Sequence, residues 1–427
     1  MLDRTLPPPH HPVTRFDLIR PRQFRFPNGI DVFVFQAGEQ ELVRIEWIVG
    51  NVFEREDQGL SHTAVCEMLL EGTSAHSSAE LAEIIDFHGA FLIPEFSFDR
   101  SALTLFSLNK HLDTLLPLVK EILAESVFPE KELATYIRNS KQKLQVSLKK
   151  NAFVARRLFN RTVYGATRYG YVPDPADYDR ITGDGLLDLF HKQFVPGNCT
   201  LVVAGKVTED VLVRLEELFG REWVAPTESQ PKSSVPVFTD VDGQLVVEER
   251  SDALQSAIRL GYRTIGRAHP DFPGLQVLNT VLGGYFGSRL MMNIREDKGY
   301  TYSVGSAIAS LQHDAFLSIA SEVGVEVTRA TLEEIRKEID KLRREPVPAA
   351  ELDVVRNYLM GAMLGSLENV FSHADKFKQA YFSGLDLTYY DYYTRVVRTI
   401  TPEELLRLAN TYLDYDRMAK VVVGRID

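Results

Sequence analysis

The chain has 427 residues, 44% of them hydrophobic, and its 59 acidic and 48 basic side chains give a formal net charge of −11. Because one hydrophobic core rarely organises this many residues, we expect two globular domains. The acidic balance, with no run of Lys or Arg, argues against nucleic acid as a partner, and the lack of any stretch of about 18 apolar residues argues against a membrane span.

Cysteine usage and the N-terminal residues indicate the compartment. Cys66 and Cys199 are the two cysteines, too few and too far apart in sequence for a disulfide framework or a C-x-x-C metal knuckle. The first residues, MLDRTLPPPHHPV, contain no apolar segment of signal-peptide length. We therefore expect a soluble cytoplasmic protein.

The first half of the chain predicts alternating strands and helices. Asn28-Gly29 favours the turn of a hairpin over 24–36, and Ser77 and Glu80 stand at capping-box spacing at the start of a helix over 77–89. Hydrophobic periodicity predicts the other elements. They are strands at 41–50, 101–109 and 198–207 and helices at 59–73, 112–126, 129–150 and 209–220.

The order of elements recurs after a segment that predicts a linker. Residues 221–244 carry three prolines and little periodicity. Beyond them, strands are predicted at 254–264, 300–310 and 314–323 and helices at 274–284, 327–345 and 348–364. The sequence PAAELDVVRNYLMGAML (348–364) echoes PEKELATYIRNSKQKL (129–144), with Glu-Leu followed shortly by Arg-Asn. We predict an internal duplication of one α/β fold, with domains at 1–220 and 245–427.

The segment GLSHTAVCEMLLEGT (59–73) raises the question of a metal site. On a helix His62, Val65 and Cys66 share one stripe. One interpretation is a core-facing stripe with a satisfied histidine. The other is a zinc helix, which needs two or three donors and a carboxylate that deprotonates the bound water.

This segment and its context resemble the pitrilysin/insulinase-type zinc peptidases, particularly the bacterial and mitochondrial-processing-peptidase-like members. Two further passages carry the resemblance, SRLMMNIREDKGYTYSVGSA (288–307) and FVPGNCTLVVAGKV (194–207), so that it covers nearly the whole chain. It implies an α+β architecture of two homologous domains, each a mainly antiparallel sheet packed with helices, in the LuxS/processing-peptidase-like metallohydrolase fold. It also implies the inverted zinc motif H-x-x-E-H, with a glutamate of a later helix as third ligand.

Matched residue by residue, the zinc motif is broken. His62 stands at the first ligand, but Val65 stands at the general base, Cys66 at the second histidine and Lys143 at the third ligand. Lys143 either brings its ammonium to the vacated metal position or is simply solvated on its helix. A weak His62/Cys66 metal pair is a further alternative. We expect no metal or other cofactor in this chain, and zinc only in a partner.

The substrate strand of the family also departs from its pattern. Catalytic relatives present G-A-x-x-N-A-x-T beside the zinc, whereas this chain has GAFLIPEF (89–96), with Ile93 at the asparagine and Pro94 next to it. Proline has no N–H to donate to an added strand, so we expect weaker peptide addition here.

The second half keeps the residues that complete the family's active site opposite the zinc. An arginine and a tyrosine seven residues apart match Arg295 and Tyr302, and Gly299 between them can end a helix. A phenol can donate to an oxyanion and a guanidinium can hold a substrate carbonyl. The alternative is structural, with the arginine capping helix-end carbonyls and the tyrosine on a strand face.

The resemblance therefore implies a non-catalytic subunit of a heterodimeric zinc peptidase. Arg295 and Tyr302 would act in trans on a peptide in the active site of a homologous partner that carries H-x-x-E-H. Two alternatives stay open: a structural member comparable to the core proteins of a respiratory complex, and a peptide-binding homodimer.

Overall fold

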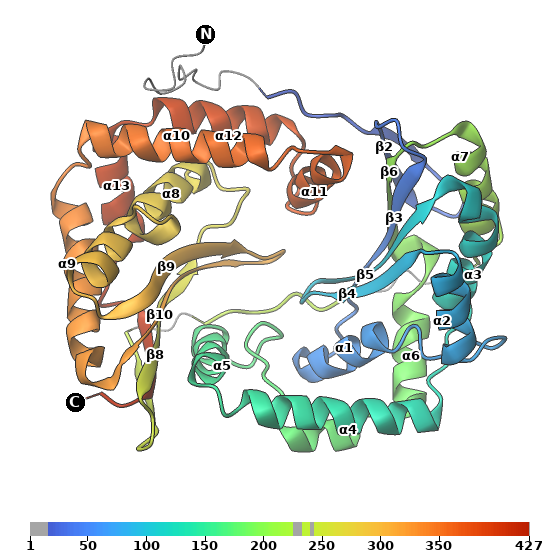
Figure 1. Cartoon of the computed structure of the whole chain (residues 1–427), viewed down its shortest axis with the longest axis horizontal. Helices are drawn as coiled ribbons and strands as arrows, with labels where there is room; N and C mark the ends of the chain where they lie inside the picture. The colour runs from blue at the N-terminus through green and yellow to red at the C-terminus, as the bar shows by residue number, and fades with distance from the viewer. Residues whose placement is uncertain (1–15, 225–232, 240–242, 427) are drawn as a thin grey trace, which may run out of the picture.

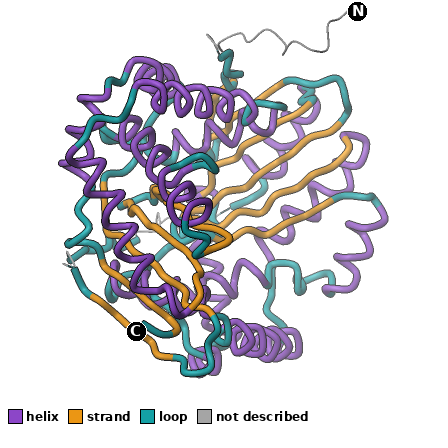
Figure 2. The backbone as a smooth tube through the Cα atoms, turned by 60° about the vertical axis from the view of Figure 1, so that its left-hand side comes forward, coloured by secondary structure: helices purple, strands orange, loops and turns teal. Residues whose placement is uncertain are grey.

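The computed structural model describes residues 16–224, 233–239 and 243–426, which form two β-sheets surrounded by helices (Figure 1 and Figure 2). The N-terminal sheet has the strand order β1-β2-β6-β3-β5-β4, and the C-terminal sheet has the order β7-β11-β8-β10-β9. The strands are β1 (Arg22–Arg25), β2 (Asp31–Gln36), β3 (Leu42–Gly50), β4 (Phe91–Phe96), β5 (Arg100–Leu108), β6 (Cys199–Gly205), β7 (Leu245–Glu249), β8 (Gln255–Thr264), β9 (Thr301–Ser310), β10 (Ala315–Gly324) and β11 (Ala419–Gly424).

The helices fall into an N-terminal and a C-terminal set. The first set is α1 (Gly59–Glu67), α2 (Ser78–Phe87), α3 (Leu112–Glu125), α4 (Glu130–Ser147), α5 (Asn151–Tyr164), α6 (Gly183–Gln193) and α7 (Glu209–Leu215). The second set is α8 (Phe272–Asn279), α9 (Thr328–Arg344), α10 (Ala349–Gly365), α11 (Val370–Tyr381), α12 (Thr388–Thr399) and α13 (Pro402–Tyr412).

The two sheets repeat one topology. In each half the first and last strands lie side by side and parallel, β2 with β6 and β7 with β11, and the other neighbours are antiparallel. Strand β1 is an addition, paired with β2 in the predicted hairpin, whose turn contains Gly29 at φ +96°. The predicted fold class, two homologous and mainly antiparallel domains, is confirmed.

The helices after the fourth strand of the repeat also correspond. Helices α3 and α4 follow β5, and α9 and α10 follow β10. Both α4 and α10 begin directly after a proline, Pro129 and Pro348, which is the position of the predicted sequence echo. Proline tolerates the start of a helix because its missing N–H has no acceptor there.

The two halves exchange one helix each. Helix α5 of the N-terminal half packs against β8 and β11 of the C-terminal sheet, where Phe159 and Val163 meet Val421 and neighbours. Helix α11 of the C-terminal half packs against β2 and β6, where Phe377 lies 4.6 Å from the ring of Phe33. In Figure 1 each of these helices lies beside the other half's strands. The exchange therefore joins the halves through buried apolar surface.

The boundaries of most predicted helices and strands lie within a few residues of those in the structure, because they follow from local sequence signals. The capping box of α2 is present, with the Ser77 hydroxyl accepting from the backbone N–H of Glu80. The predicted helix 59–73 is wrong in its length, because α1 ends at Glu67 and the chain turns away so that Gly72 pairs with Ser77 and Thr73 with Ser126. These bridges are tertiary, so periodicity did not reveal them.

The predicted linker is only partly described, since residues 225–232 and 240–242 lie outside the described residues. The described part packs against the N-terminal half: Phe53 N–H donates to Ser233 Oγ at 3.0 Å, and the ring of Phe238 stacks on Tyr169 at 5.8 Å. Strand β7 begins at Leu245. We propose the domain division 1–220, 221–244 and 245–427 on this basis.

Candidate functional site

His62 is fully buried on α1, which packs against α6 and the β4–β5 hairpin. Its Nδ1–H donates to Oε1 of Gln193 at 2.6 Å, and its ring lies 4.2 Å from the ring of Phe53. The guanidinium of Arg168 lies 4.1 Å from the same Phe53 ring. His62 is therefore fixed by its hydrogen bond to Gln193 and packs against the ring of Phe53, which also contacts the buried guanidinium of Arg168.

Burial and charge keep both possible donors of α1 neutral. Burial, together with the positive charge of Arg168, lowers the pKa of His62 to about 4, although the hydrogen bond to Gln193 raises it. Arg168 has a side chain only 2% exposed and pairs with Glu56 at 2.9 Å. Burial raises the pKa of the Cys66 thiol to about 12. At neutral pH the helix presents an uncharged imidazole and a protonated thiol.

This donor set does not fit zinc. Nε2 of His62 is buried and has no hydrogen-bond partner among the described residues, so one donor is available. However, Val65 is fully buried where a carboxylate would be needed, and the metal-binding form of Cys66 is the thiolate. No group of three or more His, Cys, Asp or Glu within residues 16–224, 233–239 and 243–426 could hold a metal ion. We therefore derive no chemistry from a metal on this helix.

Lys143 is exposed on α4, and no ion pair is recorded for it within the described chain. This exposed position agrees with the second alternative given above, a lysine solvated on the surface of its helix. The buried cation near His62 is Arg168, which the sequence analysis did not single out. Its partners Glu56 and Phe53 lie more than 100 positions away in sequence, and no local pattern marks such a contact.

The structure brings Arg295 and Tyr302 together on the C-terminal half. Arg295 lies on a short π-helical segment, Met291–Asp297, and Gly299 at φ +67° turns the chain into β9, which carries Tyr302. The guanidinium carbon of Arg295 lies 5.1 Å from the ring centroid of Tyr302 and 4.7 Å from that of Phe286. Cation–π attraction to two rings orients the guanidinium.

The pair faces outward. Tyr302 is 86% exposed and Phe286 62% exposed, and no hydrogen bond from the Tyr302 hydroxyl is recorded among the described residues. Nor is Arg295 recorded there as donating to a helix-end carbonyl; its ion partner is Glu296 at 3.4 Å. Phe286 was missed from the sequence, although an aromatic residue between two glycines, in GGYFGS, is a usable signal.

A cavity of about 340 Å³ adjoins Tyr302. Its walls come from α5 and from β8, β9 and β10, and its polar residues include Arg259, Ser303 and Glu322. Helix α1 contributes none of the lining residues, and His62 itself is fully buried. Within one chain, Tyr302 and helix α1 therefore do not share this cavity.

Strand β4, which contains Ile93 and Pro94 of the predicted substrate strand, is the edge of the N-terminal sheet. Its pairing with β5 aligns Pro94 with Leu103 and Ile93 with Thr104. Phe91 and Ile93 are 65% and 42% exposed. Proline is tolerated on an edge strand because it can leave the ladder on one side intact. The edge is open, but Pro94 removes one donor.

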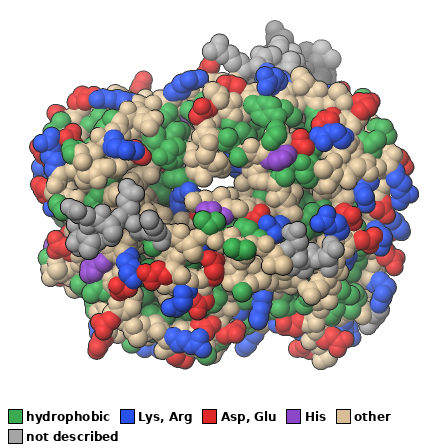
Figure 3. All heavy atoms as spheres, turned by 180° about the vertical axis from the view of Figure 1, so that it is seen from behind, with side chains coloured by type: hydrophobic (Ala, Val, Ile, Leu, Met, Phe, Trp, Pro, Cys, Tyr) green, Lys and Arg blue, Asp and Glu red, His purple; other side chains and the backbone are tan. Residues whose placement is uncertain are grey.

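A cavity of about 460 Å³ lies between the halves, among β3, the β4–β5 and β9–β10 hairpins and α11. In Figure 3 the surface is hollowed at its centre. Beside this cavity four charges alternate in a closed ring: Arg44 contacts Glu46 at 2.9 Å and Asp375 at 2.8 Å, and Lys378 contacts Asp375 at 2.9 Å and also Glu46. The ring ties β3 to α11.

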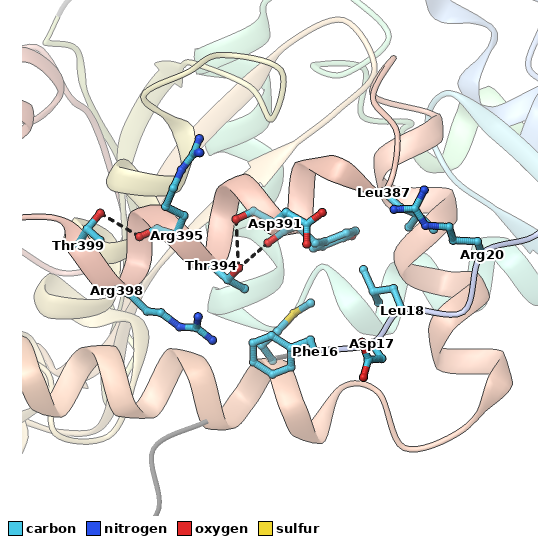
Figure 4. A pocket seen from close by; sticks show the side chains of 12 residues that line it. Phe16, Asp17, Leu18, Arg20, Leu387, Asp391, Thr394, Arg395, Arg398 and Thr399 are labelled. Atoms are coloured by element: carbon cyan, nitrogen blue, oxygen red, sulfur yellow. Dashed lines mark hydrogen bonds between the residues drawn. The ribbon is translucent and has the colours of Figure 1, made fainter. Parts of the chain in front are cut away.

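A further cavity of about 590 Å³ lies between α12 and residues 16–20 (Figure 4). Arg20, Arg395 and Arg398 line it together with Asp17 and Asp391. Cations and carboxylates both face this cavity, so its charge is mixed.

Two family models match successive parts of the chain. Residues 42–171 match the model described as "Insulinase (Peptidase family M16)", and residues 180–359 match the one described as "Peptidase M16 inactive domain". The chain belongs to peptidase family M16. The M16 fold is also that of a protease from Helicobacter pylori, with a TM-score of 0.86 at 18% identity over 95% of this chain and 100% of that one. An M16 inactive domain from Pseudomonas fluorescens gives a TM-score of 0.85 at 21% identity, over 95% and 98% of the two chains.

Sequence relatives carry the names of zinc proteases and of a probable inactive metalloprotease. An uncharacterized zinc protease of Bacillus subtilis is 25% identical over 319 residues, 74% of this chain and 76% of its own. An uncharacterized zinc protease of Rickettsia felis is 23% identical and covers 90% of this chain and 92% of its own. A probable inactive metalloprotease of B. subtilis is 22% identical over 82% and 86% of the two chains. None of the described helices of this M16 chain is both long and apolar enough to cross a bilayer.

Proposed function

We propose that this M16 chain is the non-catalytic subunit of a two-chain zinc peptidase and that it supplies Arg295 and Tyr302 to the active site of a partner with an intact H-x-x-E-H. The observation that carries the proposal is the outward-facing pair: Tyr302 is 86% exposed beside the Arg295 guanidinium. The unsuitable donor set around His62 supports it, because a chain that cannot hold zinc has no use for the pair by itself.

Each residue of the pair has a chemical role in this proposal. The Tyr302 hydroxyl donates a hydrogen bond to the oxyanion that forms when a peptide carbonyl is attacked. The Arg295 guanidinium, held between two rings, donates to a substrate carbonyl and fixes its position. Zinc bound by the partner would supply the activated water.

The partner and the compartment follow from the same reasoning. The partner is a homologous M16 chain that carries the zinc ligands, and the substrate is an extended peptide or an unfolded segment. We propose the cytoplasm as the compartment, because both cysteines of this chain are buried and unpaired.

The test is made on the complex with the zinc-bearing chain that co-purifies. Tyr302→Phe should lower kcat by about 10²-fold, the low end for losing one oxyanion donor. Arg295→Ala should mainly raise KM, because it removes a contact that the bound substrate makes before reaction. Size-exclusion chromatography checks that each complex persists.

Tyr300→Phe is the matched control, because Tyr300 lies two residues from Tyr302 but packs on the C-terminal core. It should leave kcat within about twofold. Full activity of the Tyr302→Phe, Arg295→Ala double variant in an intact complex would leave this chain a structural role. The absence of any co-purifying M16 chain would favour the structural alternative without a peptidase partner.

A second candidate, a peptide-binding homodimer, is favoured by β4 alone. This edge exposes Phe91 and Ile93, and an open edge can accept a peptide strand. If this candidate is correct, the isolated chain should bind an unstructured peptide without hydrolysing it, and Ile93→Lys should weaken binding. Calorimetry on the isolated chain, with sedimentation for its oligomeric state, separates this function from the first.

A further inference from the structure

A cavity of about 190 Å³ lies among α8, α10, α11 and α12, away from the Arg295–Tyr302 pair. Its charged lining residues are Arg267 and Lys376, and none of the described residues that line it is Asp or Glu. Gln276, Gln379, Tyr389 and Tyr393 add polar groups to the walls. The volume is several times the ~30 Å³ that one water occupies in the liquid, so a small ligand with water fits.

The two cations lie against aromatic rings. The Arg267 guanidinium lies 5.7 Å from the ring centroids of both Phe272 and Tyr389, and the Lys376 ammonium lies 6.0 Å from that of Tyr390. Aromatic faces attract cations, but by less than a buried carboxylate would. The rings therefore hold the two charges in place without neutralising them.

No ion pair joins either cation to a carboxylate within the described residues. The nearest carboxylate in sequence, Asp375, is engaged by Arg44 and Lys378 in the charge ring. Burial, followed by repulsion from Arg267, lowers the pKa of Lys376, and the negative charge of Asp375 offsets this only in part. Two like charges that share a partly buried cavity raise the free energy of the folded protein, and an anion between them would remove this cost.

We propose that this cavity binds a small oxyanion, a phosphate or carboxylate group, between Arg267 and Lys376. The amide groups of Gln276 and Gln379 provide further donors. The neighbouring cavity of Figure 4 contains three arginines but also two aspartates, so its own carboxylates offset most of its positive charge. The all-cationic lining distinguishes the proposed site.

The site is separate from the proposed peptidase role. Arg267 N–H donates to Ser310 Oγ at the end of β9, whereas Tyr302 stands near its start. Eight residues of strand separate the two positions, roughly 25 Å. Arg267 and Gln379 also line the cavity between the halves, so the two cavities adjoin.

The experiment is calorimetric titration of the full chain with inorganic phosphate and, in a second arm, with acetate, both at constant ionic strength. Saturable binding of either anion is expected, and the arm with the lower Kd distinguishes phosphate from carboxylate. Lys376→Gln and Arg267→Gln should each weaken binding by about tenfold or more. Lys376→Arg keeps the charge and should bind within a few-fold of the wild type.

The matched control is Arg395→Gln, which removes a cation from the mixed-charge cavity and should leave the affinity unchanged. Without added anion, Lys376→Gln should melt at the same temperature as the wild type or higher, because it relieves repulsion. In saturating phosphate the order should reverse. No saturable binding up to about 10 mM, or equal affinity in Lys376→Gln and the wild type, would overturn the proposal.

Discussion

Lowering the pH from 7 to 5 should destabilise the N-terminal half through His62. Its folded pKa is about 4 because it is buried near Arg168, whereas an unfolded histidine titrates near 6.5. The unfolded chain therefore takes up the proton first, and stability falls as the pH drops from 6.5 to 4 and then levels off. From these two pKa values, the loss between pH 7 and pH 5 is about 2 kcal/mol.

Urea unfolding at several pH values, followed by tryptophan fluorescence, measures this loss. Both tryptophans, Trp47 and Trp223, are buried in the N-terminal half, so the signal reports on that half. His62→Gln should flatten the pH dependence by about 2 kcal/mol relative to the wild type. His191→Gln, on the exposed side of α6, is the control and should follow the wild type. Parallel pH profiles for wild type and His62→Gln would show that His62 is not a neutral, desolvated group.

Three further outcomes are expected. Chelator-free protein should contain no stoichiometric zinc by metal analysis, and one tightly held zinc per chain would contradict our account of α1. The triple variant Val65→Glu, Cys66→His, Lys143→Glu should recover zinc binding more readily than peptidase activity, because Ile93 and Pro94 still disturb the substrate strand. Competition with a chromogenic chelator measures the zinc binding. Fast peptide hydrolysis by this variant alone would show that the substrate strand matters little. Lys378→Met should lower the free energy of unfolding by roughly 3 kcal/mol, since it leaves the buried Glu46 carboxylate with Arg44 as its one remaining partner in the charge ring. An unchanged thermal unfolding temperature would mean that the charge ring does not stabilise the contact between the halves.

Much of the fold could be predicted because its signals are local. The capping box at Ser77 and the turn at Gly29 are written within four residues, and the structure has both. The end of α1 could not be predicted, because a bridge between Thr73 and Ser126 decides it. Helices α5 and α11 were not predicted, and their place on the opposite sheets depends on contacts with the other half.

The candidate site divides in the same way. The seven-residue spacing of Arg295 and Tyr302 is a short-range pattern, and the structure places the two side chains together. The surroundings of His62 could not be predicted, because Gln193 lies 131 residues away and Arg168 acts on it across the ring of Phe53. The identity of the buried cation near His62, Arg168, is therefore decided by tertiary packing.

The reciprocal placement of α5 and α11 bears on how such a protein can arise and change. A polypeptide of half this length that contains such a helix would leave part of its own sheet uncovered until a second copy contributed its helix in return, as in a domain-swapped pair. Fusing two copies makes the exchange intramolecular, so that the assembly no longer depends on concentration. Fusion also ends the requirement that both copies be identical, so that the surroundings of His62 in one half and the Arg295–Tyr302 surface in the other can change independently.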